Sequence, residues 1–189
     1  MPRAADPTTR ARILDVAGRL FYVRGIRAVG LAEIVTAAGC GKNVLYRHFA
    51  TKDELVLAYL HAMADRLDPA MEQAVAGLAR VPSGALVAVA REVAAQVVAP
   101  EFRGCPFRNY LREMRDDTDA RGRFARAEIA PLRARVDALV DELGTDDPAA
   151  VAAQVWLVLE GLYASAPYGD PVEAATAAVG LVQEILAAA

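Results

Sequence analysis

Apolar residues recur at helical spacing along most of the chain, and no segment shows the alternation of a β-strand. The first repeat, Ile13, Leu14, Ala17, Leu20 and Phe21, predicts an amphipathic helix that ends at Arg24-Gly25. Two short helices are predicted next, over about 31–38 and 42–49, with Gly39-Cys40-Gly41 between them. Two short helices joined by a glycine-containing turn are typical of a helix-turn-helix.

Capping residues mark the helix starts in the rest of the chain. Thr51 and Glu54 fit a capping box that opens a helix at about residue 51, which is expected to kink or end at Pro69. Asp6-Pro7, Asp147-Pro148 and Asp170-Pro171 each place an N-cap carboxylate before a proline suited to the first helical position. The remaining helices are expected over about 84–98 with Ser83 as cap, 106–117, 119–143 with a disturbance at Pro131, 148–165 and 171–188. The pattern predicts an all-α chain of about nine helices.

Charge is distributed unevenly along the chain. The whole chain carries a net charge of −3, which by itself argues against binding nucleic acid. Residues 1–66, however, hold ten Lys+Arg against six Asp+Glu, a net of +4, and residues 67–189 hold 11 against 18, a net of −7. A basic first part and an acidic remainder indicate two units with different partners.

Composition excludes several classes of protein. The 189 residues include 41 alanines, which favours helices, and supply enough apolar and charged residues for a folded core. Two cysteines cannot build a disulfide scaffold or a cysteine-rich zinc site, so a reducing cytoplasm is expected. The uninterrupted apolar runs fall short of a membrane span, and the N-terminus lacks the apolar stretch of a secretory signal.

The helix predicted over 42–49 has the two faces that a DNA-reading helix needs. Leu45 and Phe49, four residues apart, can pack inward. Its polar side chains, Lys42, Asn43, Tyr46, Arg47 and His48, remain available to reach a major groove. Alternatively, the polar residues form an ordinary solvated face and Tyr46 completes a three-helix core. For His48 a packing or phosphate role is favoured over metal binding, because no Cys or second His stands at ligand spacing from it.

Residues 10–60 resemble the N-terminal domain of the TetR family of bacterial transcriptional regulators. The resemblance is most specific in the run G-x-x-x-x-x-L-Y-x-H-F-x-x-K-x-E-L, present here as Gly39 to Leu55. It implies a three-helix helix-turn-helix DNA-binding domain over 1–50, followed from the connecting helix at about 51 by a larger helical ligand-binding and dimerisation domain over 51–189. It further implies DNA contacts by Lys42, Asn43, Val44, Tyr46, Arg47, His48 and Lys52. The sequence departs from the family pattern at Gly30-Leu31-Ala32, which offers no hydroxyl cap, and at Cys40, where an aliphatic residue is usual.

The resemblance also implies a homodimer, formed through the last two helices, and a pocket for a small-molecule inducer. Apolar stripes on those two helices fit a dimer surface, or equally the chain's own core. The G-C-P-F segment beginning at Gly104 is similar to one branch of the family. The candidate pocket residues are Phe102, Cys105, Phe107, Tyr110, Met114, Trp156 and Tyr163, with Arg108 and Glu160 as polar partners, although each apolar one also fits plain core.

The function expected is that of a repressor that binds a palindromic operator as a homodimer and is released by a ligand. No catalytic residues, cofactor or metal are expected, because no phosphate loop, metal-ligand spacing or nucleophile motif appears. A helical protein-interaction module, or a small-molecule-binding protein without operator binding, is the alternative. A redox switch between Cys40 and Cys105 is disfavoured, since the two residues fall in different predicted units.

Overall fold

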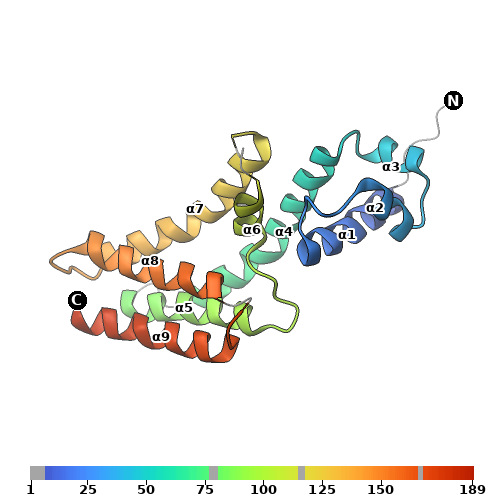
Figure 1. The fold of residues 1–189 in the computed structure, drawn as a ribbon. Coiled ribbons are helices and arrows are strands. Elements are labelled where there is room, and N and C mark those ends of the chain that lie inside the picture. Colours follow the sequence, from blue (N-terminus) through green and yellow to red (C-terminus); the bar gives the residue numbers. More distant parts are fainter. Residues whose placement is uncertain (1–6, 77–80, 115–117, 166–167) are drawn as a thin grey trace. The chain divides into compact units, whose positions relative to one another are not determined.

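A computed structural model describes residues 7–76, 81–114, 118–165 and 168–189, and these residues form nine α-helices without a β-strand (Figure 1). The helices are α1 (Pro7–Arg24), α2 (Leu31–Ala37), α3 (Lys42–His48), α4 (Lys52–Val75), α5 (Pro82–Val98), α6 (Pro106–Glu113), α7 (Ala120–Asp141), α8 (Pro148–Ser165) and α9 (Pro171–Ala188). The predicted all-α class is confirmed.

Two helices continue through a proline that was expected to interrupt them. α4 runs past Pro69 to Val75, so of the two expected outcomes at Pro69, a kink or an end, the end is wrong, and α7 contains Pro131 in its interior. An internal proline removes one helical hydrogen bond, at a cost of about 3 kcal/mol. In α7, Ala125 before the proline and Val136 and Val140 after it are buried, and their packing on both sides offsets that cost.

The predicted aspartate caps are present where the structure describes them. Asp170 accepts hydrogen bonds from the backbone N–H groups of Val172 and Glu173, at 2.8 and 3.2 Å, and Asp147 accepts one from Ala150 at 3.0 Å. Asp6 lies outside the described residues. Ser83, by contrast, does not cap α5, because that helix begins at Pro82, two residues before the expected start at 84, and has no side-chain cap.

The described residues divide into two compact units. The head unit comprises Met1–Asp65 and Pro106–Glu128, and the body unit comprises Arg66–Cys105 and Ile129–Ala189. α6 and the first part of α7 thus belong to the same unit as α1–α3. The functional boundary near residue 50 stays a prediction.

The head unit is built around α1, α2 and α3, which contact one another pairwise (Figure 1). Its core consists of side chains spaced three or four residues apart on each helix, namely Ile13, Ala17, Phe21, Ile34, Leu45 and Phe49. Phe21 also packs edge-on against Tyr59 of α4, with ring centroids 5.7 Å apart. The buried face of α3 therefore rests on α1 and α2, which turns its other face outward.

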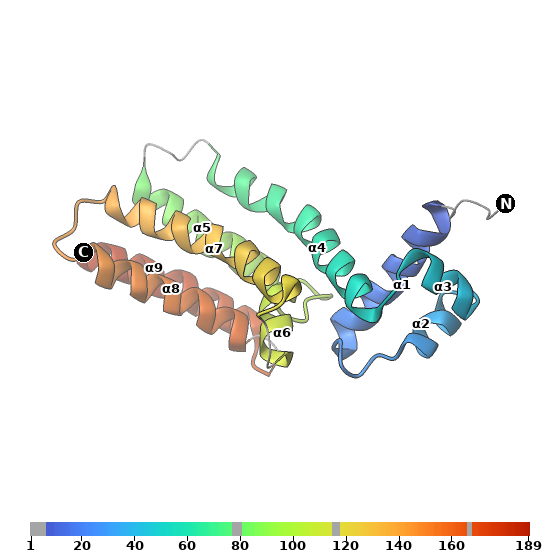
Figure 2. The ribbon, with the colours of Figure 1, turned by 90° about the horizontal axis from the view of Figure 1, so that it is seen from above.

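In the body unit, α5, α8 and α9 pack side by side (Figure 2). The side chains in their shared core are mostly small aliphatic ones. The buried residues include Val89, Val93, Val155, Leu159 and Val182. By length and composition α9 could cross a membrane, because it has 18 residues with a mean hydropathy of 1.2. Of these residues, 17% are buried. It contains Glu173 and Glu184 and contacts both α5 and α8, as a helix of a folded bundle does.

Candidate nucleic-acid interface

The inner face of α3 anchors the helix. Leu45 and Phe49 are fully buried, which confirms that they pack inward. Phe49 ends α3 in an extended conformation, and the Arg10 guanidinium of α1 lies 4.8 Å from the centre of its ring. α3 is therefore held at its middle and at its end.

The outer face of α3 presents polar side chains to solvent. Lys42, Asn43 and Arg47 are exposed, and the Lys42 ammonium lies 5.9 Å from the centre of the Tyr46 ring. Tyr46 is 41% exposed, so the alternative in which it completes the three-helix core is wrong. Val44 and His48, at the flanks, are half-buried. The exposed hydrogen-bond donors among the predicted DNA-contact residues of α3 thus lie on one outward surface, with the half-buried Val44 and His48 at its edges.

Glycines shape the entry to α3. Gly39 adopts a φ of +57°, a left-handed conformation that favours glycine, and lets the chain reverse between α2 and α3. Gly41 at the start of α3 and Gly30 at the start of α2 provide no side-chain cap. Cys40 in this turn and Cys105 are not joined by a disulfide and belong to different units.

Lys52 opens α4 next to the helix-turn-helix. The capping box forms, since the Glu54 N–H donates to the Thr51 hydroxyl at 3.1 Å. The Glu54 carboxylate, however, reaches one residue further back than expected, to the Ala50 N–H at 2.8 Å. The half-buried Lys52 ammonium donates to the Ile26 carbonyl at 2.6 Å, so one of its three donors is already used within the protein.

Sequence reasoning missed the ion pairs that link the start of α7 to the first turn of α4, next to Lys52 in the sequence. Asp119 caps α7 by accepting from the Arg121 and Gly122 N–H groups at 2.9 Å, and it also pairs with the Arg121 guanidinium. That hydrogen bond with Arg121 lowers the pKa of Asp119 below its ordinary value and raises the pKa of Arg121. Arg121 also pairs with Asp53 in the first turn of α4. No local pattern announces this link, because Asp53 and Arg121 lie far apart in the sequence.

The uneven charge persists when it is counted by unit. The head unit holds 15 Lys+Arg against 11 Asp+Glu, a net of +4, and the body unit holds 6 against 13, a net of −7. Both lysines of the chain, Lys42 and Lys52, are in the head unit. Its positive excess favours a polyanion as partner.

Comparison with known proteins identifies this head. Residues 13–59 match the family model of bacterial regulatory proteins of the tetR family. A solved TetR-family transcriptional regulator from Streptomyces coelicolor is 30% identical and covers 95% of each chain with a TM-score of 0.86. The chain belongs to the TetR family. This family consists of transcriptional regulators, which confirms the expectation that the protein is not an enzyme.

Two curated TetR relatives share the N-terminal segment. The transcriptional activator FasR of Mycolicibacterium smegmatis is 43% identical over 65 residues, which are 34% of this chain and 30% of that protein. The transcriptional repressor KstR2 of Rhodococcus jostii is 38% identical over 71 residues, 35% of each protein. The match therefore spans about a third of the length of these curated relatives.

The predicted ligand-pocket residues divide between the two units. Phe107, Tyr110 and Met114 lie in the head unit, where Phe107 and Tyr110 are buried and the Phe107 ring meets Phe124 at 6.3 Å. The body unit holds Phe102, Cys105, Trp156 and Tyr163. The predicted polar partner Arg108 is 7% exposed, and Glu160 is half-buried.

Two of the body-unit candidates come together. The Phe102 and Tyr163 rings lie 6.2 Å apart, and the Tyr163 hydroxyl donates to the Gln96 side chain at 3.2 Å. Trp156 lies instead against the Arg133 guanidinium, at 5.7 Å. Gln96 is a polar group that sequence reasoning missed, because its position in α5 carries no local signal.

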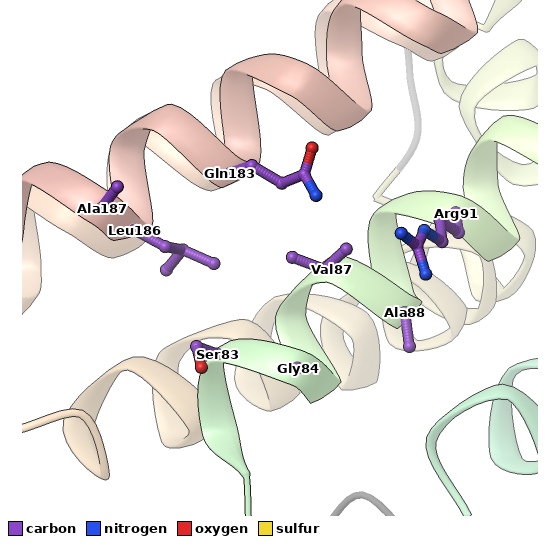
Figure 3. Close-up of a pocket in the computed structure, with 8 residues that line it drawn as sticks. All are labelled: Ser83, Gly84, Val87, Ala88, Arg91, Gln183, Leu186 and Ala187. Carbon is purple, nitrogen blue, oxygen red and sulfur yellow. The ribbon is translucent and has the colours of Figure 1, made fainter.

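An open hollow of about 530 Å³ lies between α5 and α9 in the body unit (Figure 3). Val87 of α5 and Leu186 of α9 point toward each other across it, near Arg91 and Gln183. None of the seven predicted ligand residues lines this hollow. Within the described residues, no group of three or more His, Cys, Asp or Glu side chains is placed to hold a metal ion.

Proposed function

We propose that this TetR-family protein is a cytoplasmic repressor that binds a palindromic operator as a homodimer and is released by a small molecule. The observation that carries the proposal is the two-faced α3. Leu45 and Phe49 fix its inner face, and Lys42, Asn43 and Arg47 stand exposed on its outer face. A helix so presented fits the major groove, which admits one α-helix and offers base edges to its side chains.

The predicted contacts have separate tasks. Lys42, Asn43, Val44 and Arg47 face the groove, where Arg47 reads a base or binds a phosphate. Tyr46, His48 and Lys52 contact the sugar-phosphate backbone. Lys52 stands at a helix N-terminus, where the backbone N–H groups add positive potential. Lys52 retains two ammonium hydrogens for a phosphate while the third is donated to the Ile26 carbonyl.

Homodimerisation through α8 and α9 is supported by apolar side chains that the chain itself does not cover. Leu157 of α8 is 68% exposed, and Leu181 and Val172 of α9 are 48% and 62% exposed. Gly161 in α8 and Gly180 in α9 have open space where a Cβ would stand, which allows another helix to approach closely. A two-fold dimer would present two α3 helices to half-sites about 34–36 Å apart.

Ligand release requires a difference in ligand affinity between two conformations of the dimer. The predicted pocket residues of the body unit supply apolar rings, at Phe102, Tyr163 and Trp156, and a polar group at Glu160. Gln96, which was not predicted, adds a second polar group beside Tyr163. Such a mixture suits a ligand with an apolar body and a few polar groups. We propose repression and not activation; of the two curated relatives described above, FasR is an activator and KstR2 is a repressor.

Operator selection tests the proposal. The full-length protein is incubated with a duplex pool carrying 30 random base pairs, and bound duplexes are recovered and sequenced over several rounds. We expect a palindromic consensus whose half-sites are separated by about one helical turn, and an affinity that falls steeply with salt. Recovery of no consensus, together with no salt-sensitive gel shift, would favour the alternative of a helical module that binds protein or small molecules.

A further inference from the structure

A carboxylate from α6 is held by the turn between α1 and α2. The Ile26 N–H donates to Glu113 Oε2 at 2.9 Å, and the Arg27 N–H donates to Glu113 Oε1. Glu113 is the last residue of α6 and lies 87 residues beyond Ile26 in the sequence, within the same head unit. Two consecutive backbone N–H groups that converge on one anion form a nest, a backbone geometry suited to carboxylates and phosphates.

The shape of the turn makes room for this carboxylate. Gly25 ends α1 through a hydrogen bond from its N–H to the Phe21 carbonyl, and it adopts a φ of +85°. A Cβ built on Gly25 would lie 3.2 Å from both Glu113 carboxylate oxygens. Glycine therefore serves two needs here, the left-handed backbone and the close approach of the carboxylate.

The peptide group between Ile26 and Arg27 is bound from both ends by opposite charges. Its N–H donates to Glu113 of α6, and its carbonyl accepts from the Lys52 ammonium of α4 at 2.6 Å. Charge-assisted hydrogen bonds at the two ends of one amide polarise it in the same direction and strengthen each other. The Ile26 side chain is buried, which fixes the turn further.

This turn sets the direction in which the chain enters the helix-turn-helix. It is followed by the fully buried Val29 and by Gly30, which opens α2, and α2 packs on both α1 and α3. A change in the turn would therefore displace α2 and the outward face of α3 relative to α1. We propose that Glu113 is a positioning residue for DNA binding, which holds the α1–α2 turn in the conformation that operator recognition requires. This inference rests on the proposed function.

The sign of the effect separates positioning from simple electrostatics. Removing one negative charge from a DNA-binding unit should raise its affinity for every DNA sequence if that charge has no other role. Loss of a positioning contact should lower affinity for the operator and leave non-specific affinity almost unchanged, because non-specific binding depends mainly on charge. The two readings thus predict opposite changes in operator affinity.

The test compares Glu113→Gln with Glu142→Gln in the full-length protein. Glu142 is exposed after the end of α7 in the body unit, and its replacement makes the same change in net charge. Dissociation constants are measured at one salt concentration for the duplex that the wild type selects and for calf thymus DNA. For Glu113→Gln we expect roughly tenfold weaker operator binding, since a hydrogen bond to a charged group is lost, with non-specific binding equal or slightly tighter. Glu142→Gln should match the wild type.

Amide hydrogen exchange adds a readout that does not need DNA. In the wild type the Ile26 and Arg27 amides should exchange slowly, and in Glu113→Gln they should be the amides whose exchange accelerates most, while the melting temperature falls by only a few degrees. Fast exchange of these two amides in the wild type would overturn the contact itself. Equal or tighter operator binding by Glu113→Gln, or an equal loss for operator and calf thymus DNA, would overturn the positioning role. A wild type that selects no duplex would overturn the proposed function and this role with it, whereas the exchange pattern would still report on the contact.

Discussion

Replacement of Lys52 by alanine is expected to weaken binding to all DNA sequences and to lower the salt dependence of binding. This side chain has two separate roles, and the substitution removes both. Its ammonium donates to the Ile26 carbonyl at 2.6 Å and lies 6.0 Å from the centre of the Phe21 ring, and its remaining hydrogens are proposed to bind a phosphate. The first role stabilises the α1–α2 turn, and the second displaces a counterion from DNA.

The two roles differ in their signature. Each phosphate contact contributes about 0.9 to the slope of log K against log salt, so two copies of Lys52 in a dimer would contribute roughly 1.8. At about 0.15 M salt, a slope of about 0.9 corresponds to roughly a fivefold loss of affinity for each contact. The hydrogen bond to Ile26 is half-exposed, and its loss should lower the free energy of unfolding by about 1 kcal/mol without altering the slope.

Fluorescence anisotropy with the selected duplex, at KCl concentrations between about 50 and 300 mM, measures the slope of log K against log salt. Arg91→Ala serves as the control, because Arg91 is exposed on α5 of the body unit and carries the same charge. Its slope should equal that of the wild type. If Lys52→Ala loses stability but keeps the wild-type slope, Lys52 holds the turn and contacts no phosphate, and the proposed backbone contact is refuted.

Three further perturbations test other parts of the proposal. Arg47→Ala should relax the selected consensus at one position of each half-site, at a cost of about 1–3 kcal/mol if Arg47 reads a base, and an unchanged consensus would assign it to a phosphate. Leu157→Glu should convert the dimer to a monomer in sedimentation velocity at micromolar concentration, because it buries a charge in an apolar interface, whereas Val98→Glu, at an exposed site on α5, should remain dimeric. Asp119→Asn keeps the cap of α7 but removes the carboxylate charge that pairs with Arg121, and should lower the free energy of unfolding by less than about 1 kcal/mol at pH 7. Because the pKa of Asp119 is lowered from 3.8 in the folded protein, the advantage of the wild type should be complete above that value and disappear as pH falls through the folded-state pKa. An advantage in urea unfolding that does not diminish as the pH is lowered below 3.8 would contradict this assignment.

Much of the fold could be predicted from the sequence because the relevant interactions are local. A helix periodicity, an N-cap and a capping box each involve residues within a few positions of one another, as Asp170 with Val172 or Thr51 with Glu54 illustrates. The same locality explains the prediction of α3, since Leu45 and Phe49 share a face whatever they pack against. Proline is the exception. Its local cost is real, but α7 continues through Pro131 because buried side chains on either side outweigh it.

The sequence by itself determined the helices of this protein, the inward and outward faces of α3 and the separation of charge between its parts. Only the tertiary structure decided which contacts hold the helix-turn-helix, α2 and α3, in place. Glu113 reaches the turn after α1 across 87 residues, Arg121 reaches Asp53, and Lys52 is partly occupied by the Ile26 carbonyl. Such contacts leave no periodic pattern in the chain, because they depend on where separate helices come to lie and not on the spacing of neighbouring residues.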